Sequence, residues 1–222
     1  PCRDNPSAFR KGVSTDTERS YLMPIVEQFE WADFWWDNAD RDGARVLLIG
    51  DSITRGYWPA VSAALQGVCF VDRLATSKGP DHPAYRYELD YFLQQTGLAY
   101  AAIHFNNGLH AAHLSAADYG RCLEAAVTHL LEAAGNAKVM LATSTPVTVP
   151  SRATQYAAFN EQVKQRNAEV LRLAQRYHLP VDDLYAAAEN RPELRLGDGY
   201  HYTEDGYRLL GGVVAEKLRC LL

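Results

Sequence analysis

The sequence predicts an α/β fold with a mostly parallel, five-stranded sheet, and two observations carry that prediction. Short apolar runs of strand length recur along the chain, at residues 45–50, 68–72, 99–105, 137–143 and 179–184. Stretches with the three- and four-residue spacing of amphipathic helices follow them, at residues 55–66, 83–96, 115–134, 152–177 and 203–222. Strands that alternate with helices of this length favour right-handed crossovers, which produce a parallel sheet.

Two segments precede the first of these strands. Residues 1–24 are polar and carry little periodicity, so we predict an N-terminal extension ahead of a single domain at residues 25–222. Five aromatic residues then crowd into a short stretch: Phe29, Trp31, Phe34, Trp35 and Trp36. Rings at this density are either buried or bind something. We expect a lid packed over one end of the sheet, with a sugar-stacking platform as the alternative.

The clearest helix is the one at residues 115–134. Its apolar residues recur at three- and four-residue steps, and Ser115 is of the type that caps a helix N-terminus. Cys69 falls in an apolar strand and Cys122 in this helix, so we expect buried free thiols and no disulfide framework.

Composition excludes several classes of function. The 222 residues suit one domain with a large core, and the net charge of −5 without a basic block argues against nucleic-acid binding. Since the chain has no apolar stretch of about 20 residues and no signal-peptide pattern, we expect neither a membrane span nor membrane binding. The default expectation is a cytoplasmic protein.

A serine follows the first strand, and a histidine with a nearby carboxylate precedes the last helix. Ser52 stands in Gly50-Asp51-Ser52-Ile53, directly after an apolar run, where open parallel sheets place their ligand crevice. A serine hydroxyl is a poor nucleophile unless a histidine takes its proton and a third group orients that histidine. His201 can be that base and Asp198, three residues earlier, its partner. The pattern predicts a serine esterase.

Such chemistry needs preset hydrogen-bond donors for the oxyanion of the transition state. The N–H of Ser52 lies at a predicted helix N-terminus, where the helix dipole favours negative charge. The side-chain amide of Asn106, after the third predicted strand, can supply a second donor. A backbone N–H in the turn at residues 76–79 can supply a third. We expect Asp51 to brace its own turn.

These blocks resemble those of the SGNH (GDSL) hydrolase superfamily, within the branch whose third block reads His-Phe-Asn-x-Gly-Leu-His. The matching stretches are Gly50–Thr54, His104–His110 and Asp198–His201. The resemblance implies a flavodoxin-like three-layer α/β/α sandwich and hydrolysis of esters without a cofactor. It implies that Ser52, His201 and Asp198 form the triad. For the second block it leaves two backbone donors open, Lys78 and Gly79, and Asn107 remains a rival to Asn106.

Several other polar residues lie near these blocks. His104, His110 and His113 cluster in sequence, but no acidic or thiol partner stands at a convincing spacing, so we expect no metal. We expect His110 to contact substrate or to support its loop, and Asn107 to contact substrate. Arg55 and Lys78 are either solvated charges or contacts to a carboxylate on an acidic sugar.

Taken together, the sequence predicts an esterase that removes acyl groups, most simply O-acetyl groups, from a small-molecule or oligosaccharide ester. A lysophospholipase or thioesterase is the alternative within enzymes. A glycan-binding relative without activity is the alternative outside them. The sequence leaves the sugar and the oligomeric state open.

Overall fold

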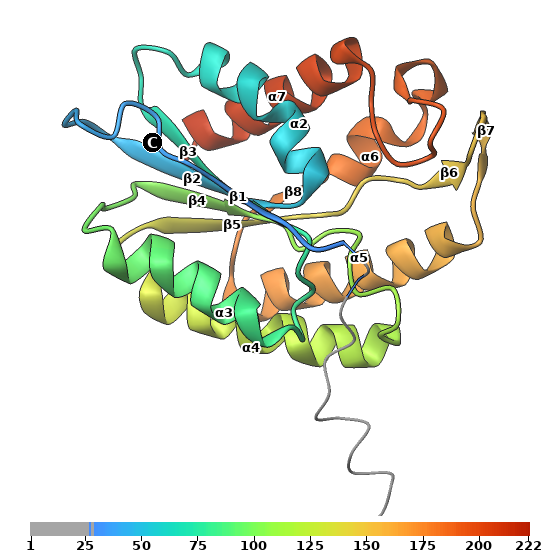
Figure 1. Ribbon diagram of the computed structural model, residues 1–222, viewed down its shortest axis with the longest axis horizontal. Helices are drawn as coiled ribbons and strands as arrows, with labels where there is room; N and C mark the ends of the chain where they lie inside the picture. Colours follow the sequence, from blue (N-terminus) through green and yellow to red (C-terminus); the bar gives the residue numbers. More distant parts are fainter. Residues whose placement is uncertain (1–26, 28) are drawn as a thin grey trace, which may run out of the picture.

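Six strands form one sheet with helices on both of its faces (Figure 1). The structure, a computed structural model, describes residue 27 and residues 29–222, so the predicted extension at residues 1–24 lies outside the described residues. The strand order is β1-β3-β2-β4-β5-β8. The bounds are β1 Ala32–Trp35, β2 Arg45–Gly50, β3 Phe70–Thr76, β4 Ala102–Phe105, β5 Lys138–Ala142 and β8 Val181–Asp182.

The last five of these strands are the five that the sequence predicts, and they pair in parallel. Their carboxyl ends therefore meet at one edge of the sheet, with Gly50 opposite Ala75 and Ile49 opposite Phe105. The segments that follow β2, β3 and β4 all start at this edge. These segments carry Ser52, the turn at residues 76–79 and Asn106.

Within the described part of the chain, helices cover both faces of the sheet, which gives the predicted three-layer sandwich (Figure 1). One layer contains α2 Ser52–Ala64, α6 Leu184–Glu189 and α7 Glu204–Arg219. The other contains α3 Pro83–Asp90 with the π-helical turn η1 Tyr91–Gln95, α4 Ala116–Ala133 and α5 Phe159–Tyr177. A short 3-10 turn, η2 Pro192–Leu194, precedes α7. Alternate residues of the strands point to the two layers: Leu47 and Ile49 pack toward α3, α4 and α5, and Val46 and Leu48 toward α2 and α7.

The lid prediction for the aromatic segment is wrong. Residues Ala32–Trp35 form β1, which pairs antiparallel with β3 and becomes the sixth, edge strand of the sheet. Aromatic residues have high strand propensity when one face of the strand is buried, and here Phe34 and Trp36 pack against Phe92. Most of these rings therefore stabilise the sheet edge.

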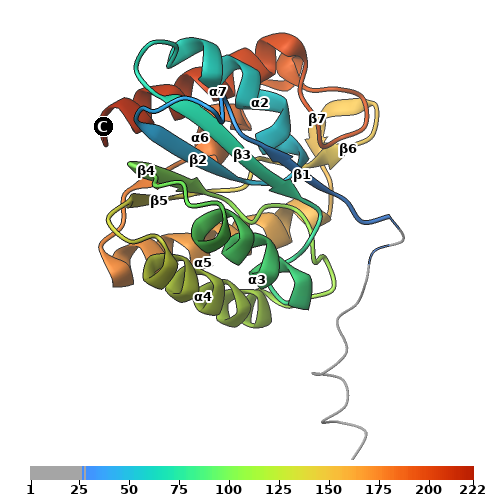
Figure 2. The ribbon, with the colours of Figure 1, turned by 60° about the vertical axis from the view of Figure 1, so that its left-hand side comes forward.

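The predicted helix at residues 152–177 starts later than its pattern indicates. Residues Arg152–Tyr156 form β7, which pairs antiparallel with β6 Thr148–Val149 in a small hairpin, and α5 begins only at Phe159. The hairpin lies near α6 and the loop that precedes α7 (Figure 2). Ser151, at its turn, has a positive φ of 61°. The Pro150-Ser151 pair was the available turn signal.

Candidate active site

Ser52, His201 and Asp198 are linked by hydrogen bonds although the first two lie 149 residues apart in the chain. The Nε2 atom of His201 lies 2.9 Å from Ser52 Oγ. On the other side of the ring, Nδ1 lies 2.7 Å from Asp198 Oδ2. The histidine can thus accept a proton from the serine while a carboxylate fixes its ring.

Asp51 fixes the turn that carries Ser52. Its Oδ1 accepts a hydrogen bond from Ile53 N at 2.9 Å, which caps α2 at its N-terminus. Its Oδ2 accepts a second one from Leu109 N at 3.1 Å and so joins this turn to the loop after β4. A Cβ on Gly108 would lie only 2.3 Å from that oxygen, so the close approach requires glycine. Asp51 therefore braces the turn, as predicted.

A second turn holds Asp198 and His201 together. The Oδ1 atom of Asp198 accepts hydrogen bonds from the backbone N–H of Tyr200 and of His201, both at 2.9 Å. Partial burial acts to raise the Asp198 pKa, but these bonds and the His201 ring outweigh it and lower the pKa below its ordinary value. The carboxylate is therefore charged whenever the histidine needs a partner.

The β6–β7 hairpin supports the same turn from outside. Thr148 N donates to Gly199 O at 2.9 Å, and Ser151 N donates to Gly197 O at 2.8 Å. Gly199 has a φ of +87°, and a Cβ there would lie 2.2 Å from Thr148 O, so only glycine fits. The hairpin that the sequence patterns did not reveal thus positions the histidine loop.

Asn106 lies beside the N-terminus of α2. Its Nδ2 donates to Ala142 O at 2.9 Å, which anchors the amide and leaves one N–H without an acceptor among the described residues. Asn106 also lines a small hollow of about 10 Å³ with Ile53, Leu109 and Ser144. A cavity of that size accommodates roughly one water-sized group.

The turn after β3 contains the two predicted backbone donors, Lys78 and Gly79. The N–H of Lys78 donates to Thr76 Oγ1 at 3.2 Å, so it is already used. The N–H of Gly79 has no acceptor in the part of the chain that the structure describes. Of these two residues, Gly79 is therefore the one whose backbone N–H can donate to an oxyanion.

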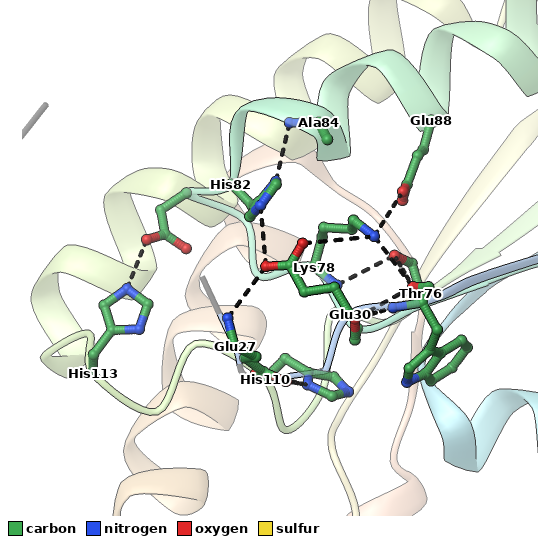
Figure 3. Close-up of polar contacts among 12 residues, drawn as sticks. Glu27, Glu30, Thr76, Lys78, His82, Ala84, Glu88, His110 and His113 are labelled. Atoms are coloured by element: carbon green, nitrogen blue, oxygen red, sulfur yellow. Dashed lines mark hydrogen bonds and ion pairs between the residues drawn. The ribbon is translucent and has the colours of Figure 1, made fainter. Parts of the chain in front are cut away.

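The Lys78 side chain points away from solvent, into a niche lined by carboxylates (Figure 3). Its ammonium lies 3.4 Å from Glu88 and 4.0 Å from Glu30 and donates to Trp31 O at 3.3 Å. Only 11% of the side chain is exposed. Lys78 is therefore not a solvated surface charge, and its ammonium is already paired with carboxylates of the protein, so neither alternative left open by the sequence describes it. Arg55, in contrast, is exposed and lies over the Trp31 ring, 4.8 Å from its centre.

The two predicted substrate contacts differ in position. His110 is partly exposed at the rim, where Nδ1 lies 2.9 Å from Glu27 Oε1 and the ring meets the edge of Trp31. Asn107 is only 7% exposed, and its amide donates to Lys78 O at 3.3 Å. The Asn107 side chain faces the interior of this turn, and its contact with substrate stays a prediction.

Each of the three clustered histidines has its own carboxylate partner. His104 pairs with Asp182, His110 with Glu27 and His113 with Asp81. Across residues 27 and 29–222, no three metal-ligating side chains gather at one point.

None of the described helices has both the length and the apolar character that a membrane crossing requires. Cys69 and Cys122 are free, partly buried thiols.

One supporting residue gave no sequence signal. Arg166, on α5, is 1% exposed and donates to the backbone carbonyls of His110, at 2.8 Å, and of Ala111. It also lies over the Tyr119 ring, 4.6 Å from its centre. Burial lowers the pKa of its guanidinium. A lone arginine in a polar helix pattern is typical of a solvated charge. Its support of the backbone at His110 and Ala111 was therefore not predictable from the sequence.

Comparison with solved structures shows the same fold at low sequence identity. A carbohydrate acetylesterase from Sinorhizobium meliloti is 17% identical, with a TM-score of 0.64, over 81% of this chain and 100% of that chain. An aryl esterase from M. smegmatis is 20% identical, with a TM-score of 0.62, over 81% and 100%. A lipase/acylhydrolase from Enterococcus faecalis is also 20% identical, with a TM-score of 0.62, over 80% and 96%.

Comparison with protein families gives a match that includes most of the site. Residues 103–209 match the GDSL-like Lipase/Acylhydrolase family, and this range contains Asn106, Asp198 and His201. No curated protein matches the chain. The predicted resemblance to GDSL hydrolases is confirmed over the matched residues, which are just under half of the chain, and the match supports a carboxylic ester hydrolase.

Proposed function

We propose that this protein is a serine esterase that removes O-acetyl groups from carbohydrates, with Ser52 as nucleophile. The observation that carries the proposal is the pair of contacts on the His201 ring, 2.9 Å to Ser52 Oγ and 2.7 Å to Asp198 Oδ2. This is the geometry that an unactivated hydroxyl needs to become a nucleophile at neutral pH.

The reaction follows from the three side chains. Ser52 Oγ attacks the ester carbonyl while its proton passes to His201 Nε2, and Asp198 stabilises the resulting imidazolium. The tetrahedral intermediate collapses, the C–O bond to the sugar breaks, and the sugar oxygen takes the proton from His201. Water, deprotonated by the same histidine, then attacks the acetyl-serine and releases acetate and free Ser52.

Three donors would stabilise the oxyanion. They are the N–H of Ser52 at the N-terminus of α2, the N–H of Gly79 and the second amide N–H of Asn106. Each comes from the carboxyl edge of a neighbouring parallel strand: β2, β3 or β4. Removal of one donor from such a site typically costs about 10²–10³ in kcat.

Two observations support a sugar as the alcohol and acetyl as the acyl group. Trp31 borders the turn at residues 76–79 through the bond from Ser77 N to its carbonyl, so an aromatic residue lies near the site. Two proteins of similar structure are described as a carbohydrate acetylesterase and an acetyl xylan esterase, which favours the same substrate class.

The test compares wild type with Ser52→Ala on p-nitrophenyl acetate, butyrate and octanoate, followed by acetylated xylo-oligosaccharides. We expect the variant to lose several orders of magnitude in kcat and the wild type to prefer acetate. Preference for octanoate would favour a lysophospholipase or thioesterase. Equal rates for wild type and variant on every ester would refute the triad.

A further inference from the structure

We infer that Asn107 is a positioning residue for the oxyanion donor, because it holds the peptide bond that carries the Gly79 N–H. The inference rests on the proposed function and adds a residue that acts through the Gly79 N–H. Asn107 Nδ2 donates to Lys78 O at 3.3 Å. That carbonyl and the Gly79 N–H belong to one peptide unit.

The geometry of the peptide bond links the two groups. The described chain contains no cis peptide bond, so the Lys78 carbonyl and the Gly79 N–H point in opposite directions within one rigid plane. Asn107, 7% exposed, lies on the interior side of this plane. A hydrogen bond that fixes the carbonyl toward the interior therefore aims the N–H at the opposite side, where it has no acceptor among the described residues.

Asn107 is itself fixed in place. Its backbone carbonyl accepts a hydrogen bond from the hydroxyl of Tyr119, a side chain that is 1% exposed. The residue before it is bound to the sheet through the bond from Asn106 N to Ile49 O at 2.9 Å. The Asn107 amide thus extends from a rigid strand end and can transmit that rigidity to the turn.

The Lys78 side chain is also held in place, by partners drawn in Figure 3. Its ammonium is held by Glu88 at 3.4 Å and by Trp31 O at 3.3 Å, so the side chain resists rotation of the turn. With the side chain fixed by these partners and the carbonyl fixed by Asn107, the peptide between Lys78 and Gly79 has little freedom to reorient. A donor fixed before the reaction starts needs no reorganisation when the oxyanion forms.

This arrangement predicts a particular kinetic signature for Asn107→Ala. Negative charge on the carbonyl oxygen develops only in the transition state, so a misaimed donor lowers kcat and leaves KM nearly unchanged. We expect a loss of about 10- to 100-fold in kcat, less than the roughly 10²–10³ for deleting a donor outright. The pH profile should keep its shape, because His201 and Asp198 are untouched.

The experiment measures kcat, KM and pH profile on p-nitrophenyl acetate, the inhibition constant of phenylboronic acid, and Tm. Phenylboronic acid forms a tetrahedral anionic adduct with a reactive serine, so its inhibition constant reports the oxyanion site directly. The variants are Asn107→Ala and the isosteric Asn107→Asp, which loses the donor at nearly constant volume. Tyr100→Phe is the matched control: Tyr100 is 9% exposed and precedes β4, and its hydroxyl donates to Asp72 Oδ2 at 3.1 Å, away from the turn at residues 76–79.

Both Asn107 variants should raise the inhibition constant of phenylboronic acid by the factor by which they lower kcat, whereas Tyr100→Phe should lower only Tm. If either folded Asn107 variant keeps wild-type kcat and wild-type inhibition, the inference is wrong. If kcat and Tm fall together in Asn107→Ala and Tyr100→Phe alike, the role of Asn107 is only structural. Failure of the triad would show itself separately, as activity that survives Ser52→Ala.

Discussion

Asp51 offers a prediction whose magnitude can be worked from two hydrogen bonds. Its carboxylate caps α2 through Ile53 N at 2.9 Å and accepts from Leu109 N at 3.1 Å, and the residue is 3% exposed. Loss of an N-cap costs about 0.5–2 kcal/mol. A donor left unpaired in a buried place costs about 1–3 kcal/mol. Asp51→Ala should therefore lower the free energy of unfolding by about 1.5–5 kcal/mol.

A second N-cap provides the matched comparison. Ser115 caps α4: Asp118 N donates to its Oγ at 3.1 Å, its hydroxyl donates to Asp118 Oδ2 at 2.6 Å, and both bonds are exposed to solvent. Ser115→Ala should cost only the cap, about 0.5–2 kcal/mol. The difference between Asp51→Ala and Ser115→Ala then reports the bond to Leu109 N, which links the Ser52 turn to the Asn106 loop.

The assay is urea unfolding followed by circular dichroism. The free energies of unfolding are compared between variants whose free energy falls with urea concentration at the same slope. Asp51→Ala should lose about 1–3 kcal/mol more than Ser115→Ala. Equal losses in the two variants would mean that the bond between the two loops contributes nothing, and the reasoning about Asp51 would be refuted.

Two further predictions concern charged groups around the site. Asp198→Asn keeps the shape of the turn but no longer favours the His201 tautomer that can accept a proton from Ser52. The kcat on p-nitrophenyl acetate should therefore fall by up to about 10⁴-fold, with little change in Tm. An unchanged kcat would contradict this prediction. Burial raises the pKa of Glu88 above its ordinary 4.5 even beside Lys78, so the folded state binds this proton more tightly than the unfolded state. Its contribution to stability is then largest below pH 4.5 and is lost as the pH rises through the folded-state pKa. Urea unfolding at several pH values above 4.5 should show that decline in wild type and a weaker one in Glu88→Gln, and parallel curves would contradict the assignment.

The sequence was most informative where one local pattern decides the structure. The five parallel strands are continuous apolar runs because both of their faces are buried, and a run of that kind is visible without a partner. The positions of Ser52 and His201 in the fold were also predictable, since Ser52 follows an apolar strand and His201 precedes an amphipathic helix. Their hydrogen bond follows once both lie at the same edge of the sheet.

Elements that depend on distant partners were harder to predict. The edge strand β1 is recognisable only through its pairing with β3, and its aromatic residues suit a lid equally well. The short hairpin β6–β7 is largely exposed, so it shows no apolar alternation. Asn107 and Arg166 act through backbone carbonyls of other segments, and a side chain that binds a backbone atom leaves no mark in the sequence.

The central claim is that Ser52 is the nucleophile, and covalent labelling tests it most directly. The protein would be treated with a fluorophosphonate and the modified residue located by peptide mass spectrometry, with His201→Ala as the comparison. We predict one adduct per chain, on Ser52, formed much more slowly in His201→Ala because the hydroxyl is then unactivated. Labelling at another serine, or an equal rate in His201→Ala, would contradict the account.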